Sequence, residues 1–108
     1  MNGPVLVDQL VEVLEQIGDL LPDDKDVWEV DVRARLAVER LWITAGNVAE
    51  AHRITAGHQV GAEPWAELYG FRNLLAHALP DDLSPDRIWA ETISDLPRLL
   101  RVVRAVRG

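Results

Sequence analysis

The residues of this sequence that could do chemistry gather in one stretch, residues 69–77, which reads Tyr-Gly-Phe-Arg-Asn-Leu-Leu-Ala-His. Here a potential acid–base residue, His77, a fixed cation, Arg72, and an amide, Asn73, lie inside an otherwise apolar segment. Apolar segments of this kind usually face a core, and polar groups beside buried surface need hydrogen-bonding partners or a functional role. These three residues are therefore the candidate site.

Helix geometry decides which of these side chains can meet. Each residue of an α-helix turns about 100° around the axis, so Asn73 and His77 share a face. Arg72 and His77 are about 140° apart and do not share a face in a regular helix. We expect them to converge only if Arg72 stands at a helix start, from which its long side chain can swing across, and Gly70 is compatible with such a start. The alternative is that Arg72 and His77 are ordinary interface or capping residues.

Composition limits the classes of protein and site. A length of 108 residues predicts one domain spanning residues 1–108. The absence of cysteine excludes disulfides, thiolate metal sites and a cysteine nucleophile. The histidines at 52, 58 and 77 lack the close spacing of a metal site, so we expect neither a metal nor another cofactor. No secretion-signal pattern or membrane-length apolar run is present, and we expect a cytoplasmic protein.

The net charge of −7 argues against a surface that coats nucleic acid broadly. The charge is unevenly placed, however. Residues 1–31 carry one basic and nine acidic residues, a net −8, whereas residues 32–108 carry ten basic and nine acidic residues, a net +1. The acidity is therefore an N-terminal property, and a positive cleft near Arg72 is compatible with the composition.

Residues 4–21 have the pattern of an amphipathic helix, with Pro4 in its first turn and Pro22 ending it. Its acidic face is either solvated surface or a docking face for a basic partner. The predicted apolar face comprises Leu6, Leu10, Val13, Leu14, Ile17, Leu20 and Leu21, and the predicted solvated face comprises Asp8, Glu12, Glu15 and Asp19.

A turn at residues 22–26 follows, in which Asp24 or Asp26 could cap the next helix. Residues 27–55 contain no proline and predict one continuous helix of about 43 Å. Its apolar residues cover more than one stripe, which suggests burial against its own chain on one side and another chain on the other. Gly46-Asn47 marks either a close helix approach or a local bend.

A loop at residues 57–62 leads to Pro64, which opens a helical turn. The candidate-site stretch then predicts a helix through about Leu79, ended by Pro80, with a turn at residues 81–83.

The last helix is predicted over residues 85–107, because Ser84-Pro85-Asp86 supplies a hydroxyl cap, a proline and an acid in order. Pro97 inside it predicts a kink or a break near Ser94–Asp95. Arg98, Arg101 and Arg104 are expected opposite its apolar face. Their positive charges either interact favourably with the helix dipole, or they contact RNA or a partner protein.

Four tryptophans, at 28, 42, 65 and 89, lie in separate helical segments and are expected to anchor the core or an interface. No sustained alternating pattern or hairpin signal competes with the helices. The fold class is therefore all-α, an antiparallel up-and-down bundle of four to five helices.

At residues 70–77 the sequence resembles the HEPN superfamily, and more closely the HepT-like toxins of prokaryotic toxin–antitoxin pairs. That family carries an arginine, a polar residue, three further residues and a histidine. The resemblance covers roughly residues 26–100. Further matching features are Pro64-Trp65, Ile88-Trp89-Ala90, Asp95-Leu96-Pro97, Glu39 and Gly46.

The resemblance implies a HEPN bundle that forms a symmetric homodimer, with a metal-independent ribonuclease site at the dimer cleft. It also implies a minimal nucleotidyltransferase as antitoxin, which neutralises the toxin by binding it or by adenylylating a tyrosine. Two positions depart from the family. Leu79 stands where the family has that tyrosine, so adenylylation there is impossible, and Gly46-Asn47 stands where the family often has Gly-Glu.

Carried onto this chain, the resemblance makes His77 from each protomer the acid and the base. Arg72 contacts the scissile phosphate of the RNA substrate, and Asn73 orients His77 or binds RNA. A competing hypothesis is a catalytically weak or inactive HEPN module that binds nucleotide or protein and partners a nucleotidyltransferase. A third is a structural helical subunit, which predicts that Arg72 and His77 lie apart and pair with unrelated residues.

Overall fold

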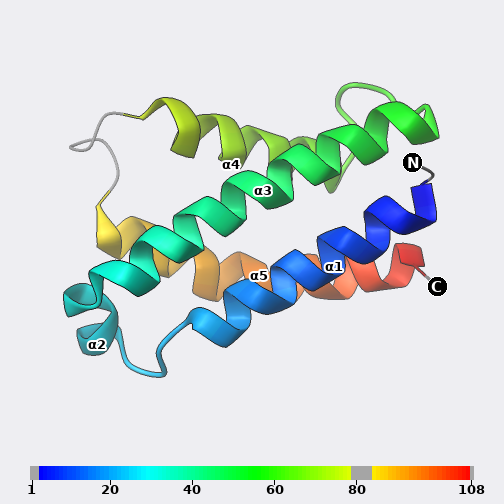
Figure 1. The fold of residues 1–108 in the computed structure, drawn as a ribbon. Helices are drawn as coiled ribbons and strands as arrows, with labels where there is room; N and C mark the ends of the chain where they lie inside the picture. Colours follow the sequence, from blue (N-terminus) through cyan, green and yellow to red (C-terminus); the bar gives the residue numbers. More distant parts are fainter. Residues whose placement is uncertain (1–2, 79–83, 108) are drawn as a thin grey trace.

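The computed structural model describes residues 3–78 and 84–107, and within these the chain forms five α-helices and no strand (Figure 1). Four long helices run up and down along the molecule, and the short α2 caps one end (Figure 1). The all-α bundle predicted from the sequence is confirmed. The helices are α1 (Gly3–Leu20), α2 (Lys25–Val30), α3 (Val32–Ala56), α4 (Trp65–His77) and α5 (Pro85–Arg107).

The central element of the bundle is α3, which packs against α1 on one side and α4 on the other. In turn, α1 packs against α5, and α2 touches both α3 and α5. The molecule is elongated, 41 × 27 × 21 Å, because these helices lie side by side along its length. The candidate-site helix α4 is therefore held chiefly by α3.

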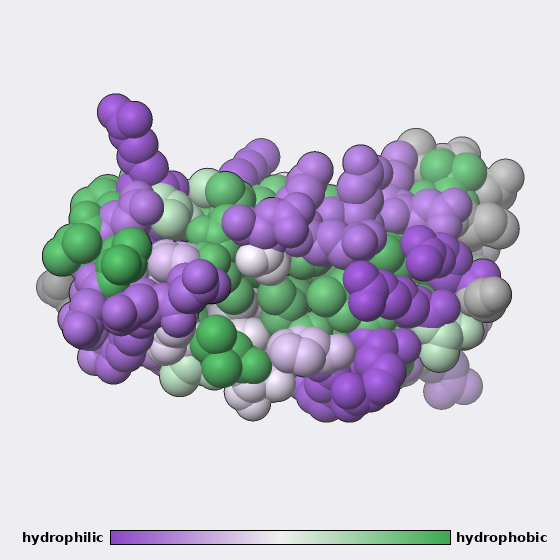
Figure 2. Space-filling view, turned by 90° about the horizontal axis from the view of Figure 1, so that it is seen from below, coloured by the Kyte–Doolittle hydropathy of each residue, from purple (hydrophilic) through white to green (hydrophobic). Residues whose placement is uncertain are grey.

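The amphipathic pattern of α1 is confirmed. Leu6, Leu10, Leu14 and Ile17 are buried, whereas Leu20, at the helix end, is exposed. The four predicted acids are all exposed on the other side. In Figure 2, which views the molecule from below, hydrophilic side chains cover much of the surface, with hydrophobic ones showing between them and at the α2 end.

The predicted continuous helix over residues 27–55 is wrong, because Asp31 divides it into α2 and α3. Asp31 leaves helical geometry (φ −94°, ψ 86°), and its side chain accepts a hydrogen bond from the Ala34 amide at 3.0 Å. An aspartate can satisfy the free amides of a new helix start, so it offers the chain an alternative to continuing. Of the two candidate caps, Asp24 and Asp26, the structure selects Asp24, which accepts from the Asp26 amide at 2.7 Å.

The start of α5 is as predicted: Ser84 Oγ accepts from the Arg87 amide at 3.1 Å, and Pro85 is the first helical residue. The predicted break at Ser94–Asp95 is absent, since α5 runs unbroken through Pro97. Pro97 is exposed, while Leu96 and Leu99 beside it are buried. The proline's missing amide and bulky ring therefore face solvent, where a helix tolerates them best.

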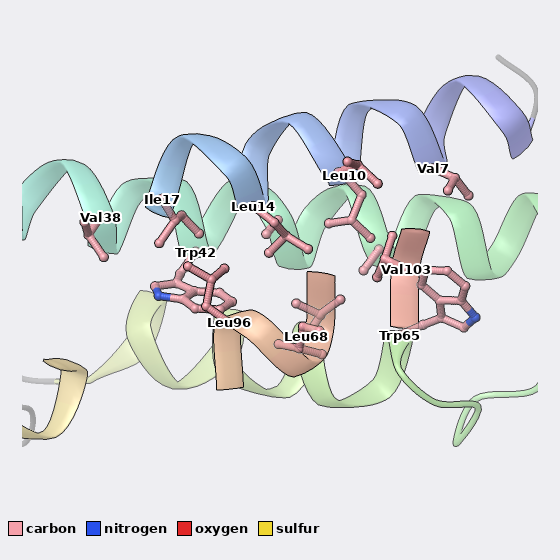
Figure 3. Close-up of a cluster of buried hydrophobic side chains, with 14 of the residues drawn as sticks. Val7, Leu10, Leu14, Ile17, Val38, Trp42, Trp65, Leu68, Leu96 and Val103 are labelled. Atoms are coloured by element: carbon pink, nitrogen blue, oxygen red, sulfur yellow. The ribbon is translucent and has the colours of Figure 1, made fainter. Parts of the chain in front are cut away.

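The tryptophans anchor the core, as expected. Trp28, Trp42 and Trp65 are buried, and Trp89 packs against Trp28 with ring centroids 5.7 Å apart. Each of the four long helices contributes to one apolar cluster (Figure 3). The labelled members are Val7, Leu10, Leu14 and Ile17 from α1, Val38 and Trp42 from α3, Trp65 and Leu68 from α4, and Leu96 and Val103 from α5.

Candidate functional site

The candidate residues Arg72, Asn73 and His77 all lie on α4. The helix begins at Trp65, after Pro64, and buried Trp65 and Leu68 fix it to the core. It ends at His77, because Ala78 is extended (φ −69°, ψ 141°). Leu79, Pro80 and the predicted turn at residues 81–83 lie outside the described residues.

A helix start near Gly70, the condition under which Arg72 and His77 could converge, is not observed. Gly70 lies inside α4, so Arg72 stands in the middle of a regular helix. The helix continues through Gly70 because its apolar anchors, such as Leu68 and Phe71, lie on both sides of the glycine. Arg72 and His77 therefore keep the separation of a regular helix, about 140° around the axis and about 7.5 Å along it.

Gly46 brings α3 into backbone contact with α4 at Arg72. A Cβ added at Gly46 would lie 2.2 Å from the Arg72 Cβ and 2.7 Å from the Leu68 carbonyl oxygen. Any larger residue would force the two helices apart. Of the two possibilities left open for Gly46-Asn47, the close helix approach is therefore confirmed.

Two amide side chains hold the guanidinium of Arg72. Its Nε donates to Asn47 Oδ1 on α3 at 2.8 Å, and its Nη1 donates to Asn73 Oδ1 at 3.0 Å. The guanidinium carbon also lies 6.0 Å from the centroid of the Tyr69 ring. A guanidinium has five N–H donors, and within the described residues only two of them meet a protein acceptor.

His77 is the last residue of α4, and its side chain is exposed. A positive charge on its imidazole would interact favourably with the negative end of the helix dipole there. Within the described residues no hydrogen bond joins His77 to Arg72 or to Asn73. The described chain thus brings Arg72 and Asn73 together but leaves His77 separate. Asn73 contacts Arg72, while its predicted role in orienting His77 or binding RNA stays a prediction.

The other two histidines meet at the opposite end of α4. His52 is buried 4.4 Å from the Trp65 ring, and His58 stacks on the same ring at 6.2 Å. The fold thus brings these two imidazoles within 5.8 Å, a proximity that their sequence spacing does not reveal. Trp65 and His77 are the first and last residues of α4, about 18 Å apart.

Glu39 lies on α3, two turns before Gly46 and on the same helix face. Burial raises the pKa of its carboxyl group, and the nearby Arg35 partly opposes that rise. A carboxylate in such a place costs free energy when it ionises.

A groove of about 620 Å³ lies between α4 and α5. Its lining is partly apolar and partly charged, and most of the charged residues are acidic. Arg98 in the lining pairs with Glu67 and with Asp95, and these contacts raise its pKa. On the same helix, Arg104 pairs with Glu15 at 3.4 Å. The apolar residues of the lining include Trp42, Leu68, Phe71, Leu74 and Leu99, and its charged residues are Glu67, Glu91, Asp95 and Arg98.

The sequence pattern indicates Arg72, Asn73 and His77 but gives no role to Asn47, whose side chain accepts a hydrogen bond from Arg72 in the fold. The signal available was Gly46, since a glycine that allows close packing also brings its neighbour to the facing helix. In the part of the chain that the structure describes, no three histidine or acidic side chains gather to hold a metal. No helix among these residues has the length and apolarity needed to cross a bilayer.

The fold and site define a class: a helical bundle that carries an arginine, a polar residue and a histidine on one helix. The family model of the HepT-like ribonucleases matches residues 10–106, and the chain belongs to that family, within the HEPN superfamily. No curated protein and no solved structure matches the chain.

Proposed function

We propose that this protein is a metal-independent endoribonuclease, the toxin of a cytoplasmic toxin–antitoxin pair. Its site is composite, with Arg72 and His77 contributed at a dimer cleft. The observation that carries the proposal is a guanidinium fixed by two amides on the helix that ends in an exposed imidazole. Membership of the HepT-like ribonuclease family supports RNA as the substrate.

The proposed reaction is transesterification within RNA. A neutral imidazole removes the proton of a ribose 2′-hydroxyl, and the 2′-oxygen attacks the adjacent phosphorus. As this bond forms, the bond from phosphorus to the 5′-oxygen breaks, and an imidazolium gives the leaving oxygen its proton. The guanidinium of Arg72 stabilises the extra negative charge on phosphorus. The products carry 2′,3′-cyclic phosphate and 5′-hydroxyl ends.

This chemistry needs an acid and a base at once, and α4 supplies one exposed histidine at its end. A homodimer with a two-fold axis beside α4 would supply the second His77. The open groove between α4 and α5, which is lined in part by apolar side chains, supports a partner surface along this helix. The separation of Arg72 from His77 along one helix also favours a site completed by another chain.

The antitoxin in this proposal is a minimal nucleotidyltransferase. Leu79 has no hydroxyl group, so neutralisation does not use adenylylation at that position. We therefore assign neutralisation to binding, with the antitoxin occluding the cleft.

The test is RNA cleavage by antitoxin-free protein in a chelating buffer. His77→Ala should reduce the rate by about 10²–10⁴-fold, as expected for losing a general acid–base group. His58→Ala is the matched control, because it removes an exposed imidazole at the far end of α4. Cyclic-phosphate ends on the products would support the mechanism.

Equal cleavage by wild type and His77→Ala would refute the assignment of His77, as would full activity from a stable monomer. Folded, dimeric protein without cleavage would instead favour a binding module that partners a nucleotidyltransferase.

A further inference from the structure

Arg72 is held by uncharged groups in an acidic protein. Its acceptors are the amide oxygens of Asn47 and Asn73, at 2.8 and 3.0 Å. Within the described residues no carboxylate lies within ion-pair distance of it. Among the other nine arginines, those at 53, 87, 98 and 104 each pair with a carboxylate, whereas those at 33, 35, 40, 101 and 107, like Arg72, form no ion pair within the described residues. Among the described residues the charge of Arg72 therefore has no ion-pair partner, although the guanidinium is fixed in position.

The neutral acceptor on α3 is there because of the helix contact at Gly46. Where the backbones of α3 and α4 touch, the next residue of α3 lies beside the side chain of Arg72. Asn47 thus reaches the Nε atom from a second helix, while Asn73 reaches Nη1 from the same helix. Nη2 donates to no group in the described chain, and Nη1 keeps a second N–H.

We propose that Asn47 is a positioning residue for Arg72. Its amide oxygen fixes the guanidinium at Nε without neutralising it, so that Nη2 and the free N–H of Nη1 face a phosphate group. This inference rests on the proposed function, since the phosphate is that of the RNA substrate. A side chain ordered before binding loses less conformational entropy when the ligand arrives, and this raises affinity.

Aspartate at position 47 separates this role from a merely structural one. Asn47→Asp keeps the size and the hydrogen bond but pairs the guanidinium with a carboxylate. A structural role predicts that the variant keeps both its fold and its activity. The positioning role predicts an unchanged or higher melting temperature together with weaker action on RNA. Asn47 is exposed, so these substitutions should not prevent folding.

The experiment measures kcat and KM for cleavage of one oligoribonucleotide over a range of salt concentrations. Asn47→Asp should lower kcat/KM by about 10- to 100-fold, less than deleting a transition-state donor outright. It should also flatten the slope of log kcat/KM against log salt by about 0.7, the value for one phosphate contact on a single strand. Asn47→Ala, which keeps the charge and loses the anchor, should cost about 2- to 10-fold with an unchanged slope.

Two controls separate the possible outcomes. Thr55→Asp adds the same charge to an exposed position two turns further along α3, and it should leave the rate and the slope unchanged. Arg72→Ala gives the effect of losing the guanidinium altogether. Suppose that Arg72→Ala abolishes cleavage. If Asn47→Asp then matches wild type, or if Asn47→Asp lowers the activity without changing the salt slope, the role of Asn47 is overturned and the proposed function stands.

If the wild type does not cleave RNA, the proposed function falls and the inference is judged by binding. Fluorescence anisotropy with the same oligoribonucleotide then compares wild type, Asn47→Asp and Thr55→Asp. Selective weakening by Asn47→Asp would uphold the positioning role, and equal binding by all three proteins would overturn it.

Discussion

Gly46→Ala is the substitution for which the structure gives the sharpest expectation. The new Cβ would lie 2.2 Å from the Arg72 Cβ, 2.7 Å from the Leu68 carbonyl oxygen and 2.9 Å from the Arg72 Cγ. Two of these atoms, the Cβ and the carbonyl oxygen, move only with the backbone of α4, so a change of side-chain rotamer cannot relieve the overlap. The helices must separate by about 1.2 Å to reach the 3.4 Å at which ordinary contact begins.

The expected cost of this separation is about 1–3 kcal/mol, the range for overpacking in a well-packed interior. Alanine is the better helix former, which offsets about 1 kcal/mol of that cost. The net loss is therefore at most about 2 kcal/mol, which corresponds to a fall in melting temperature of up to about 15 °C for a domain of this size. The same movement would carry Asn47 Oδ1 from 2.8 Å out of hydrogen-bonding range of Arg72 Nε. RNA cleavage should therefore fall together with stability.

Thermal and urea unfolding followed by circular dichroism measure the stability. Gly70→Ala is the matched control: Gly70 is exposed inside α4, and an added Cβ there meets nothing within 4 Å. That variant should be more stable by about 0.5–1 kcal/mol, because alanine loses less backbone entropy in a helix. If Gly46→Ala were as stable as Gly70→Ala, the close contact between α3 and α4 would be refuted.

Three further substitutions test the fold around the site. Glu39→Gln should raise the free energy of unfolding at neutral pH. Burial raises the pKa of Glu39, so the folded state binds the proton more tightly than the unfolded state does, and ionisation of Glu39 lowers the free energy of unfolding as the pH rises above the ordinary pKa of 4.5. In urea titrations the stability gained by Glu39→Gln should therefore vanish below that pH. Asp31→Ala removes the cap on the Ala34 amide and should cost about 1 kcal/mol in urea unfolding, with an unchanged value refuting its role in dividing α2 from α3. Thr92→Val keeps the side-chain shape but leaves the buried Trp42 indole N–H without its acceptor at 3.0 Å; calorimetry should show a loss of about 1–3 kcal/mol, and a neutral result would mean that this bond contributes little.

Local patterns predicted the helices well where one residue type has one dominant effect. The spacing of leucines in α1, the cap at Asp24 and the serine–proline–aspartate start of α5 all led to the observed elements. Gly46 indicated either a close helix approach or a local bend, and the packing of α3 on α4 decides for the close approach.

The sequence did not predict the structure at residues that are compatible with two local conformations, because tertiary packing decides between them. Asp31 can lie within a helix or cap a new one, and α2 needs the break to lie against both α3 and α5. Pro97 can break a helix or be tolerated on its exposed side, and buried Leu96 and Leu99 select the second outcome. The bond between Asn47 and Arg72 joins residues 25 positions apart, so no local periodicity could reveal it.

The positions of Arg72 and His77 have different structural origins. Arg72 is fixed from α3, through the contact at Gly46 and the amide of Asn47, whereas His77 stands at the end of α4. Changes on α3 should therefore alter how the transition-state charge is stabilised while leaving the acid–base group in place. Deletion of the imidazole should stop proton transfer while leaving the phosphate contact. If the composite site is correct, His77→Ala should stop cleavage while leaving RNA binding, whereas Asn47→Asp should weaken both, because it changes the charge beside Arg72.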